Sequence, residues 1–196
     1  DLDFRGAGDI SKMLGLKPQK TMLDYLDALK DKSAAPKKED FFTPFSKTLD
    51  FIPAILKPGY TPHLELIRLK DAFSSIDKEY DYIVIDCGVS FNDVLVNVLN
   101  QANLILLVVT PDILSVHQAK WTMDTLQSLH FPLKMVRLVI NRAESASSIS
   151  WQEINVALSC EIISMIPSEG RAALEALNRG VPVVKNSPRG KITASI

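Results

Sequence analysis

The residues of this chain best suited to chemistry follow a short apolar run in its first half. Residues 82–85 read Tyr-Ile-Val-Ile, and Asp86, Cys87 and Gly88 come directly after them. Such a run predicts a strand that is buried on both faces, as in the centre of a parallel sheet. Ligands of open α/β sheets gather at the carboxyl ends of strands, where a carboxylate can hold the magnesium of a nucleotide. On this motif alone, a solvated aspartate at an ordinary strand end is an equally good interpretation.

Polar residues are expected at the same edge of the sheet from two other places in the chain. Asp1, Leu2 and Asp3 look like the end of a strand, and Asn141 and Arg142 end another apolar run. Asp3 could orient an attacking water or help to hold a cation, although a turn or capping aspartate fits the local sequence equally well. Three polar signals along one edge favour a ligand site.

Three further features could contact a nucleotide. Gly88 could bring its backbone N–H close to a terminal phosphate, although a plain turn glycine is the better local interpretation. The amide of Asn141 suits the edge of a purine base, while an Asn at a strand end is more often a turn residue. The loop Ile166-Pro167-Ser168-Glu169 could flank the base, or be a simple strand-to-helix turn with a Ser cap.

Alternating strands and helices must position these residues. Strands are predicted, in chain order, at 49–56, 82–86, 104–109, 136–141 and 162–166, the first made irregular by Pro53 and the next three buried. Four helices are predicted to begin after the caps Asp9, Thr21, Ser115 and Ser168 and to end near residues 14, 29, 129 and 178, respectively. Three more helices are predicted over residues 61–78, 92–100 and 150–159. Gly180 would follow the helix that ends near 178. This alternation predicts βαβ units and a parallel sheet.

Composition places the chain among ordinary α/β proteins. Its 196 residues suffice for one domain, with 46% hydrophobic and 23% charged residues. The net charge of −1 gives no general argument for nucleic acid or an anionic membrane. Cys87 and Cys160 have no metal-ligand spacing and form no disulfide framework, which fits a reducing cytoplasm. Because the chain opens at what looks like the end of a strand, we expect it to be a fragment.

Six motifs occur in an order and spacing that together are specific. They are Asp1-Leu2-Asp3-Phe4 with Gly8, Leu14 and Gly15; Tyr82–Asp86; Cys87-Gly88-Val89; 102–112 with Ser115; Val139-Ile140-Asn141-Arg142; and Ile166–Glu169 with Ala176, 178–182 and Ser187-Pro188. With them the chain resembles the ParA/MinD family of deviant Walker ATPases over essentially its whole length, most of all the CpaE or TadZ branch of pilus-assembly and localisation proteins. In that family the first three motifs are switch I, Walker B and the start of switch II.

The resemblance implies a fold, cofactors and residue roles. The fold would be a single domain over residues 1–196, with three α/β/α layers, a mostly parallel sheet and a P-loop NTPase-like topology. Members bind ATP with magnesium and often dimerise around two nucleotides. By position, Asp3 and Asp86 would be catalytic residues. Asp86 would hold magnesium through water, with Asp1 as a second metal residue beside it. The nucleotide contacts would come from Gly88, Asn141, Arg142, Pro167, Ser168 and Glu169.

The largest departure from the family is the Walker A loop, which should lie about one helix upstream of Asp1 and is not in this sequence. That loop supplies the amides and lysine that cradle phosphates, so we expect little ATP affinity from these residues alone. Members of the CpaE branch can also carry altered Walker A loops, which leaves hydrolysis by the intact protein open.

Two functional interpretations follow. The first is an ATP-hydrolysing positioning switch that dimerises on nucleotide, and the second is a non-hydrolysing scaffold of the same fold that acts through protein partners. An NAD-binding or receiver domain is disfavoured, because no GxGxxG follows a strand. We expect a homodimer in the cytoplasm, recruited to the pole or inner membrane by partners of a localisation or secretion system. Lys185, Arg189 and Lys191 are too scattered to support DNA or membrane contact.

Overall fold

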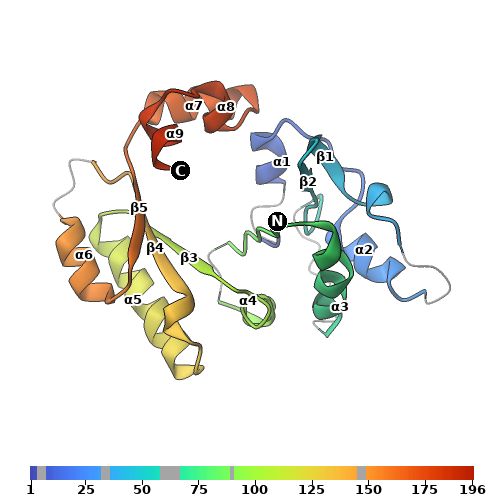
Figure 1. Cartoon of the computed structure of the whole chain (residues 1–196), viewed down its shortest axis with the longest axis horizontal. Coiled ribbons are helices and arrows are strands. Elements are labelled where there is room, and N and C mark those ends of the chain that lie inside the picture. Colours follow the sequence, from blue (N-terminus) through green and yellow to red (C-terminus); the bar gives the residue numbers. More distant parts are fainter. Residues whose placement is uncertain (4–7, 32–35, 58–66, 89–90, 145–148) are drawn as a thin grey trace. The chain divides into compact units, whose positions relative to one another are not determined.

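The computed structural model describes residues 1–3, 8–31, 36–57, 67–88, 91–144 and 149–196 (Figure 1). Its contacts divide the chain into two compact units, which are described separately. Unit 1 comprises residues 1–101 and 177–181, and unit 2 comprises residues 102–176 and 182–196. Phe4, Val89 and the start of the helix predicted from 61 lie outside the described residues. The single domain predicted for residues 1–196 stays a prediction.

Unit 1 consists of short helices around a small antiparallel hairpin. Its elements are α1 (Asp9–Met13), α2 (Met22–Ala28), the 3-10 turn η1 (Lys38–Asp40), β1 (Thr43–Ser46), β2 (Leu49–Phe51), α3 (Ile67–Ile76), η2 (Asp77–Glu79) and α4 (Asp93–Leu99). β1 and β2 pair antiparallel, so the strand predicted over 49–56 ends before Pro53. The core is formed by buried side chains of α2, α3, α4 and the segments beside them: Leu2, Met22, Tyr25, Leu26, Ile52, Ala54, Leu69, Ala72, Phe73, Ile76 and Val98.

Helix caps in unit 1 follow the sequence only in part. Thr21 caps α2 as predicted, in a capping box where its hydroxyl accepts the Asp24 N–H and the Asp24 carboxylate accepts the Thr21 N–H. Asn92 caps α4 through the N–H of Leu95. The cap predicted at Asp9 is wrong, because Gly8 occupies that position and Asp9 lies in the first turn.

Tyr80 ties three parts of unit 1 together. Its hydroxyl donates to the Asp50 carboxylate on β2 at 2.7 Å, and the ammonium of Lys38 lies 4.7 Å from the centre of its ring. Lys38 also pairs with Glu79 at 3.2 Å. The hydrogen bond joins the segment before Asp86 to the hairpin across 30 residues of sequence.

The prediction of a buried strand over residues 82–86 is wrong for this structure. The segment has no strand pairing, and the side chains of Tyr82 and Val84 are 87% and 90% exposed. Ile85 packs partly against the core of unit 1. Exposed and partly buried side chains therefore alternate along Val84, Ile85 and Asp86, as in an extended chain. Burial on both faces requires neighbouring strands, and no ladder to the described residues is formed here.

Unit 2 contains a parallel sheet, as predicted. Its elements are β3 (Ile105–Val109), α5 (Ile113–Ser128), the 3-10 turn η3 (Leu133–Met135), β4 (Val136–Asn141), α6 (Trp151–Leu158), β5 (Ile162–Ile166), α8 (Val183–Asn186) and α9 (Lys191–Ser195). Helix α7 (Gly170–Arg179) begins in unit 2 and ends in unit 1. The strand order is β3-β4-β5, all parallel, which makes two βαβ units and confirms the α/β class.

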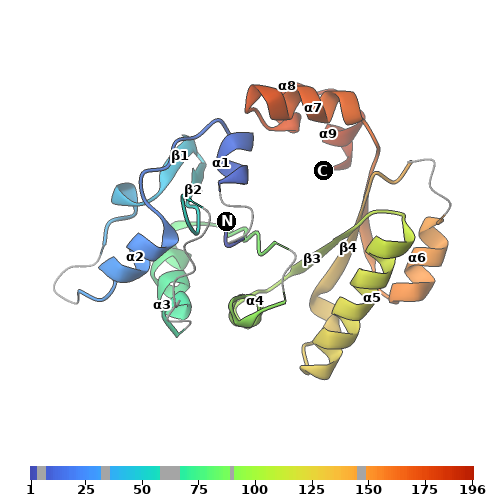
Figure 2. The same ribbon diagram turned by 180° about the vertical axis from the view of Figure 1, so that it is seen from behind.

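Helices α5 and α6 lie side by side against one face of this sheet (Figures 1 and 2). The buried side chains of β3, β4, α5 and α6 include Val109, Val116, Ala119, Met123, Leu126, Val136, Leu138, Ile140, Ile154 and Leu158. On β3 the burial alternates, and Leu106 and Val108 are 52% and 57% exposed. The prediction that this strand is fully buried is therefore wrong, since one of its faces is open.

The cap of α5 also differs from the prediction. Asp112, rather than Ser115, is the N-cap: its carboxylate accepts the Ser115 N–H at 2.9 Å, while the Ser115 hydroxyl accepts the Thr110 N–H. Hydrogen bonds from the Thr110 hydroxyl and then from the Ser115 N–H lower the pKa of Asp112. Trp121 in α5 and Trp151 in α6 are both about half exposed.

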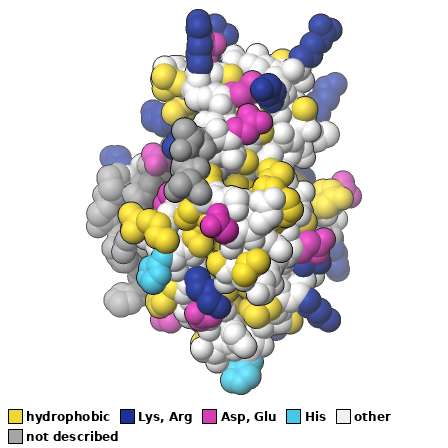
Figure 3. Space-filling view, turned by 90° about the vertical axis from the view of Figure 1, so that its left-hand side faces the viewer, with side chains coloured by type: hydrophobic (Ala, Val, Ile, Leu, Met, Phe, Trp, Pro, Cys, Tyr) yellow, Lys and Arg dark blue, Asp and Glu magenta, His cyan; other side chains and the backbone are white. Residues whose placement is uncertain are grey.

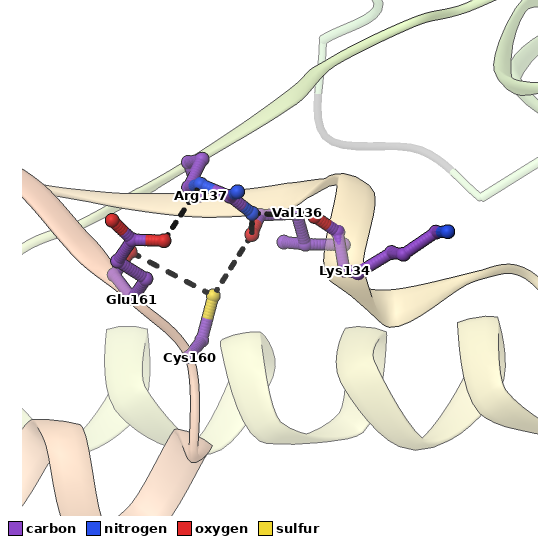
Figure 4. Close-up of polar contacts among 5 residues, drawn as sticks. All are labelled: Lys134, Val136, Arg137, Cys160 and Glu161. Atoms are coloured by element: carbon purple, nitrogen blue, oxygen red, sulfur yellow. Dashed lines mark hydrogen bonds and ion pairs between the residues drawn. The ribbon is translucent and has the colours of Figure 1, made fainter.

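Arg137 joins the amino ends of β4 and β5 (Figure 4). Its Nε pairs with the Glu161 carboxylate at 3.0 Å, and its Nη1 donates to the carbonyls of Lys134 and Val136. The buried Cys160 thiol donates to the same Val136 carbonyl at 3.4 Å. These contacts link the segment before β4 to the segment before β5 at the amino edge of the sheet.

Candidate functional site

The predicted acidic residues of unit 1 lie together, although they come from opposite ends of its sequence. The N–H of Leu2 donates to the backbone carbonyl of Asp86 at 2.7 Å, which places Asp1 and Asp3 beside the turn after residue 86. The N–H of Asp3 donates to the Asp1 carboxylate at 2.9 Å. The grouping of these three aspartates, predicted from the order of motifs, is therefore present within unit 1.

Gly88 forms part of the same group. It has a left-handed backbone, with φ of +62°, and its N–H donates to the Asp86 carboxylate at 2.9 Å. The Asp3 carboxylate lies directly over its Cα, because a Cβ built there would be 2.5 Å from the Asp3 Cγ. The predicted contact of the Gly88 N–H with phosphate stays a prediction, and in this structure that N–H is bonded to Asp86.

The donor chemistry here fits magnesium. Asp86 is exposed, and the Gly88 N–H takes one of its carboxylate oxygens. Magnesium usually keeps several waters and binds through one or two carboxylates and substrate phosphates, which suits Asp86 with Asp1 nearby. Among the described residues no group of three or more His, Cys, Asp and Glu could form an all-protein metal cage.

Cys87 lies between Asp86 and Gly88 and is half-buried. Burial, and then the negative charge of Asp86, raise the pKa of its thiol to about 11. A protonated thiol is a poor nucleophile and a poor metal ligand, so Cys87 contributes packing rather than chemistry.

In unit 2 the predicted base-contact residues lie at the carboxyl edge of the sheet. Asn141 pairs in register with Ile166, and its side-chain oxygen accepts the Arg142 N–H at 3.0 Å. Arg142 has a φ of +56°, which is rare for a residue with a side chain, and its side chain is exposed. The Ala143 N–H donates to the Ile166 carbonyl at 2.9 Å, so the two loops stay adjacent past the strands.

The loop after β5 has mixed roles. Pro167 is buried and Ser168 is exposed. The Glu169 carboxylate accepts the N–H of Ile192 at the start of α9, at 3.1 Å, so it holds that helix in place. A carboxylate used this way supports the loop; its predicted contact with a nucleotide stays a prediction.

A pocket of about 690 Å³ opens at this carboxyl edge. Residues that follow each of the three strands line it, namely Pro111, Ala143 and Pro167, with Trp151 from α6 and Lys191 from α9. Its volume is in the range of small-molecule sites. Figure 3 shows one face of the molecule, on which hydrophobic side chains gather between charged ones.

Of the residues that line this pocket, Pro167 is the one that the sequence predicted to contact a nucleotide. The others were not predicted as site residues, since a Trp at a helix start or a Lys near the chain end gives no local signal of a binding pocket. Asn141, Arg142, Ser168 and Glu169 lie outside the lining of this pocket. Asp3, Asp86 and Gly88 belong to unit 1 and Asn141 to unit 2, so their predicted convergence on one sheet edge stays a prediction.

Known proteins match most of this chain. The AAA domain model matches residues 49–136, which is less than half of it. The septum site-determining protein MinD of Thermotoga maritima is 26% identical over 123 residues, which cover 60% of this chain and 45% of that protein. The cell division protein PomZ of Myxococcus xanthus is 25% identical over 206 residues, covering 97% of this chain and 63% of PomZ.

A solved ParA family ATPase from Chlorobium tepidum TLS superposes with a TM-score of 0.84 at 25% identity, over 95% of this chain and 77% of its own. Together these matches show that the chain is similar to MinD, PomZ and ParA family proteins. Two solved MinD proteins share the fold of this chain. One, with Mg-ADP, is from Pyrococcus horikoshii OT3 and superposes with a TM-score of 0.76 at 19% identity, over 95% of this chain and 74% of its own. The other, in a MinC:MinD complex from Aquifex aeolicus, superposes with a TM-score of 0.72 at 22% identity, over 91% of this chain and 71% of its own. The P-loop NTPase-like α/β fold is thereby confirmed.

The chain matches only part of the length of these relatives. It spans about half of the Thermotoga maritima MinD and less than two thirds of PomZ. Among the described residues, none of the helices has the length and apolar character needed to cross a membrane.

Proposed function

We propose that this chain belongs to an ATP-binding and ATP-hydrolysing positioning switch that dimerises on nucleotide. The observation that carries the proposal is the match of 95% of the chain to a ParA family ATPase at a TM-score of 0.84. The neighbouring carboxylates of Asp1, Asp3 and Asp86 in unit 1 support it, because they are the groups that magnesium and an attacking water require.

The residues would divide the work as follows. Asp86 would hold magnesium through water, with Asp1 beside it, and Asp3 would orient and accept a proton from the attacking water. Magnesium, when bound, neutralises charge on the phosphate oxygens. Asn141, Arg142 and the Pro167–Glu169 loop would contact the base in unit 2. The solved MinD with Mg-ADP is a relative in fold for which these cofactors are present.

The partners and location follow the same analogy. We propose a homodimer that works with protein partners of a localisation or secretion system, as a member of the CpaE or TadZ branch. The MinC:MinD complex shows a protein of this fold in complex with a protein partner. The protein would reside in the cytoplasm and be recruited to the pole or inner membrane.

The test compares this chain with a form extended upstream of Asp1 to include the expected Walker A loop. Isothermal titration with Mg-ATP should detect binding by the extended form and little or none by the 196 residues alone. Phosphate release should be lost in the extended Asp3→Ala variant while ATP binding is kept. Turnover that persists in this variant would refute the role of Asp3, and binding without any turnover in the parent would favour the scaffold.

A further inference from the structure

We propose that Gly88 is a positioning residue for Asp3. The inference starts from the close approach of two segments that lie 85 positions apart in the sequence. A Cβ at position 88 would lie 2.5 Å from the Asp3 Cγ and 2.7 Å from each of its carboxylate oxygens. Real Cβ atoms do not approach other atoms so closely, so any side chain at 88 must displace the Asp3 carboxylate.

Two hydrogen bonds donated by backbone N–H groups hold Asp3 beside the turn at Gly88. The Leu2 N–H is bonded to the Asp86 carbonyl at 2.7 Å, which anchors the backbone directly before Asp3. The Asp3 N–H is bonded to the Asp1 carboxylate at 2.9 Å. With the backbone held on its N-terminal side, the half-buried Asp3 side chain rests on the bare Cα of Gly88.

The backbone of Gly88 is committed as well. Its N–H is bonded to the Asp86 carboxylate at 2.9 Å, and its φ of +62° is one that side chains disfavour. Glycine is therefore required twice, once for the turn and once for the space that Asp3 occupies. The catalytic consequence rests on the proposed function, whereas the positioning itself does not.

The first experiment measures position in the 196-residue chain by NMR. A nuclear Overhauser cross-peak between the Asp3 Hβ and Gly88 Hα protons is expected in the parent. It should be lost in Gly88→Ala and also in Gly88→Asn, because Asn tolerates positive φ but still carries a Cβ. Gly170→Ala is the matched control, since a Cβ there meets nothing within 4 Å. A cross-peak to residue 88 that survives in folded Gly88→Asn would overturn the proposal.

The second experiment measures kcat in the form extended upstream of Asp1. If Gly88 acts through Asp3, Gly88→Asn should lower kcat by roughly 100-fold, the scale of a lost general base, and should add less than about twofold in an Asp3→Ala background. Additive losses with a raised KM would mean that Gly88 contacts the phosphate instead, which would overturn the proposal. If the extended form has no ATPase activity, the proposed function fails while the NMR result still decides the positioning.

Discussion

Replacing Tyr80 by Phe removes one hydroxyl and leaves the ring contacts of unit 1 in place. The hydroxyl donates to the Asp50 carboxylate at 2.7 Å. Hydrogen bonds to charged groups contribute about 1.5–3 kcal/mol, and half-exposed Asp50 can regain water, so we expect a loss of about 1.5 kcal/mol. With a urea slope of about 2 kcal/mol/M, the unfolding midpoint should fall by about 0.7 M at pH 7.

The difference between parent and variant should also depend on pH. Burial raises the pKa of Tyr80 well above its usual value, helped by the hydrogen bond to Asp50 and its charge. A raised folded pKa means that the stabilisation is complete below about pH 10, the pKa of an unfolded tyrosine, and declines as pH rises above it. The gap between the two unfolding midpoints should therefore shrink above pH 10. Lysines also titrate there, but they are common to both proteins and cancel in the comparison.

Tyr82→Phe is the matched control, because that tyrosine is almost fully exposed. It should change the free energy of unfolding by less than about 0.5 kcal/mol and keep the parent's dependence on pH. Equal midpoints for Tyr80→Phe and the parent at pH 7 would refute the assigned hydrogen bond. A gap that stays constant from pH 8 to pH 11.5 would refute the titration of Tyr80.

Three other predictions follow from the described contacts. Thr21→Ala breaks the capping box of α2 and should cost about 1 kcal/mol, measured by urea unfolding; an unchanged midpoint would show that the box is not stabilising. Because its pKa is raised to about 11, the Cys87 thiol should carry roughly 300-fold less thiolate than an ordinary cysteine at pH 7.5, so its alkylation, followed by mass spectrometry, should be slow at pH 7.5 and accelerate towards pH 11. Hydrogen bonds at the caps of α5 and α6 lower the pKa of Asp112 and of Glu153. The stabilisation by these carboxylates is therefore present above the usual carboxyl pKa and is lost as pH falls through the lower pKa values of the folded protein. The double variant Asp112→Asn with Glu153→Gln should show a smaller fall in the free energy of unfolding from pH 5 to pH 2, measured by urea unfolding.

The regular elements were predictable where local sequence decides them. The bounds of β4 and β5 agree with prediction to the residue, because apolar β-branched runs end there at turn residues. Thr21 was predictable as a cap because Asp24 follows it at capping-box spacing. Near α5 the sequence offers Asp112 and Ser115 within one turn, so only the structure shows which of them is the cap.

Burial and proximity were harder to predict because they depend on distant residues. Residues 82–86 have the composition of a central strand, yet Tyr82 and Val84 are exposed, and within the described part of the chain they pair with no neighbouring strand. Polar residues at expected strand ends suggested that Asp3 and Asp86 lie near each other, but the space that Gly88 leaves for Asp3 depends on backbone angles and on contacts across 85 residues. The pocket residues Trp151 and Lys191 come together only through the fold.

The exposed side chains and the unpaired edge of β3 in the described sheet have a practical consequence for anyone who handles this protein. Residues 105–109 read Ile-Leu-Leu-Val-Val, with neither charge nor proline, and in the described sheet β3 pairs on one side alone, with β4. A hydrophobic strand with unused backbone donors and acceptors is a template for self-association through edge-to-edge pairing. Light scattering of concentrated samples should therefore grow with time, and a lysine in place of exposed Val108 should prolong their shelf life.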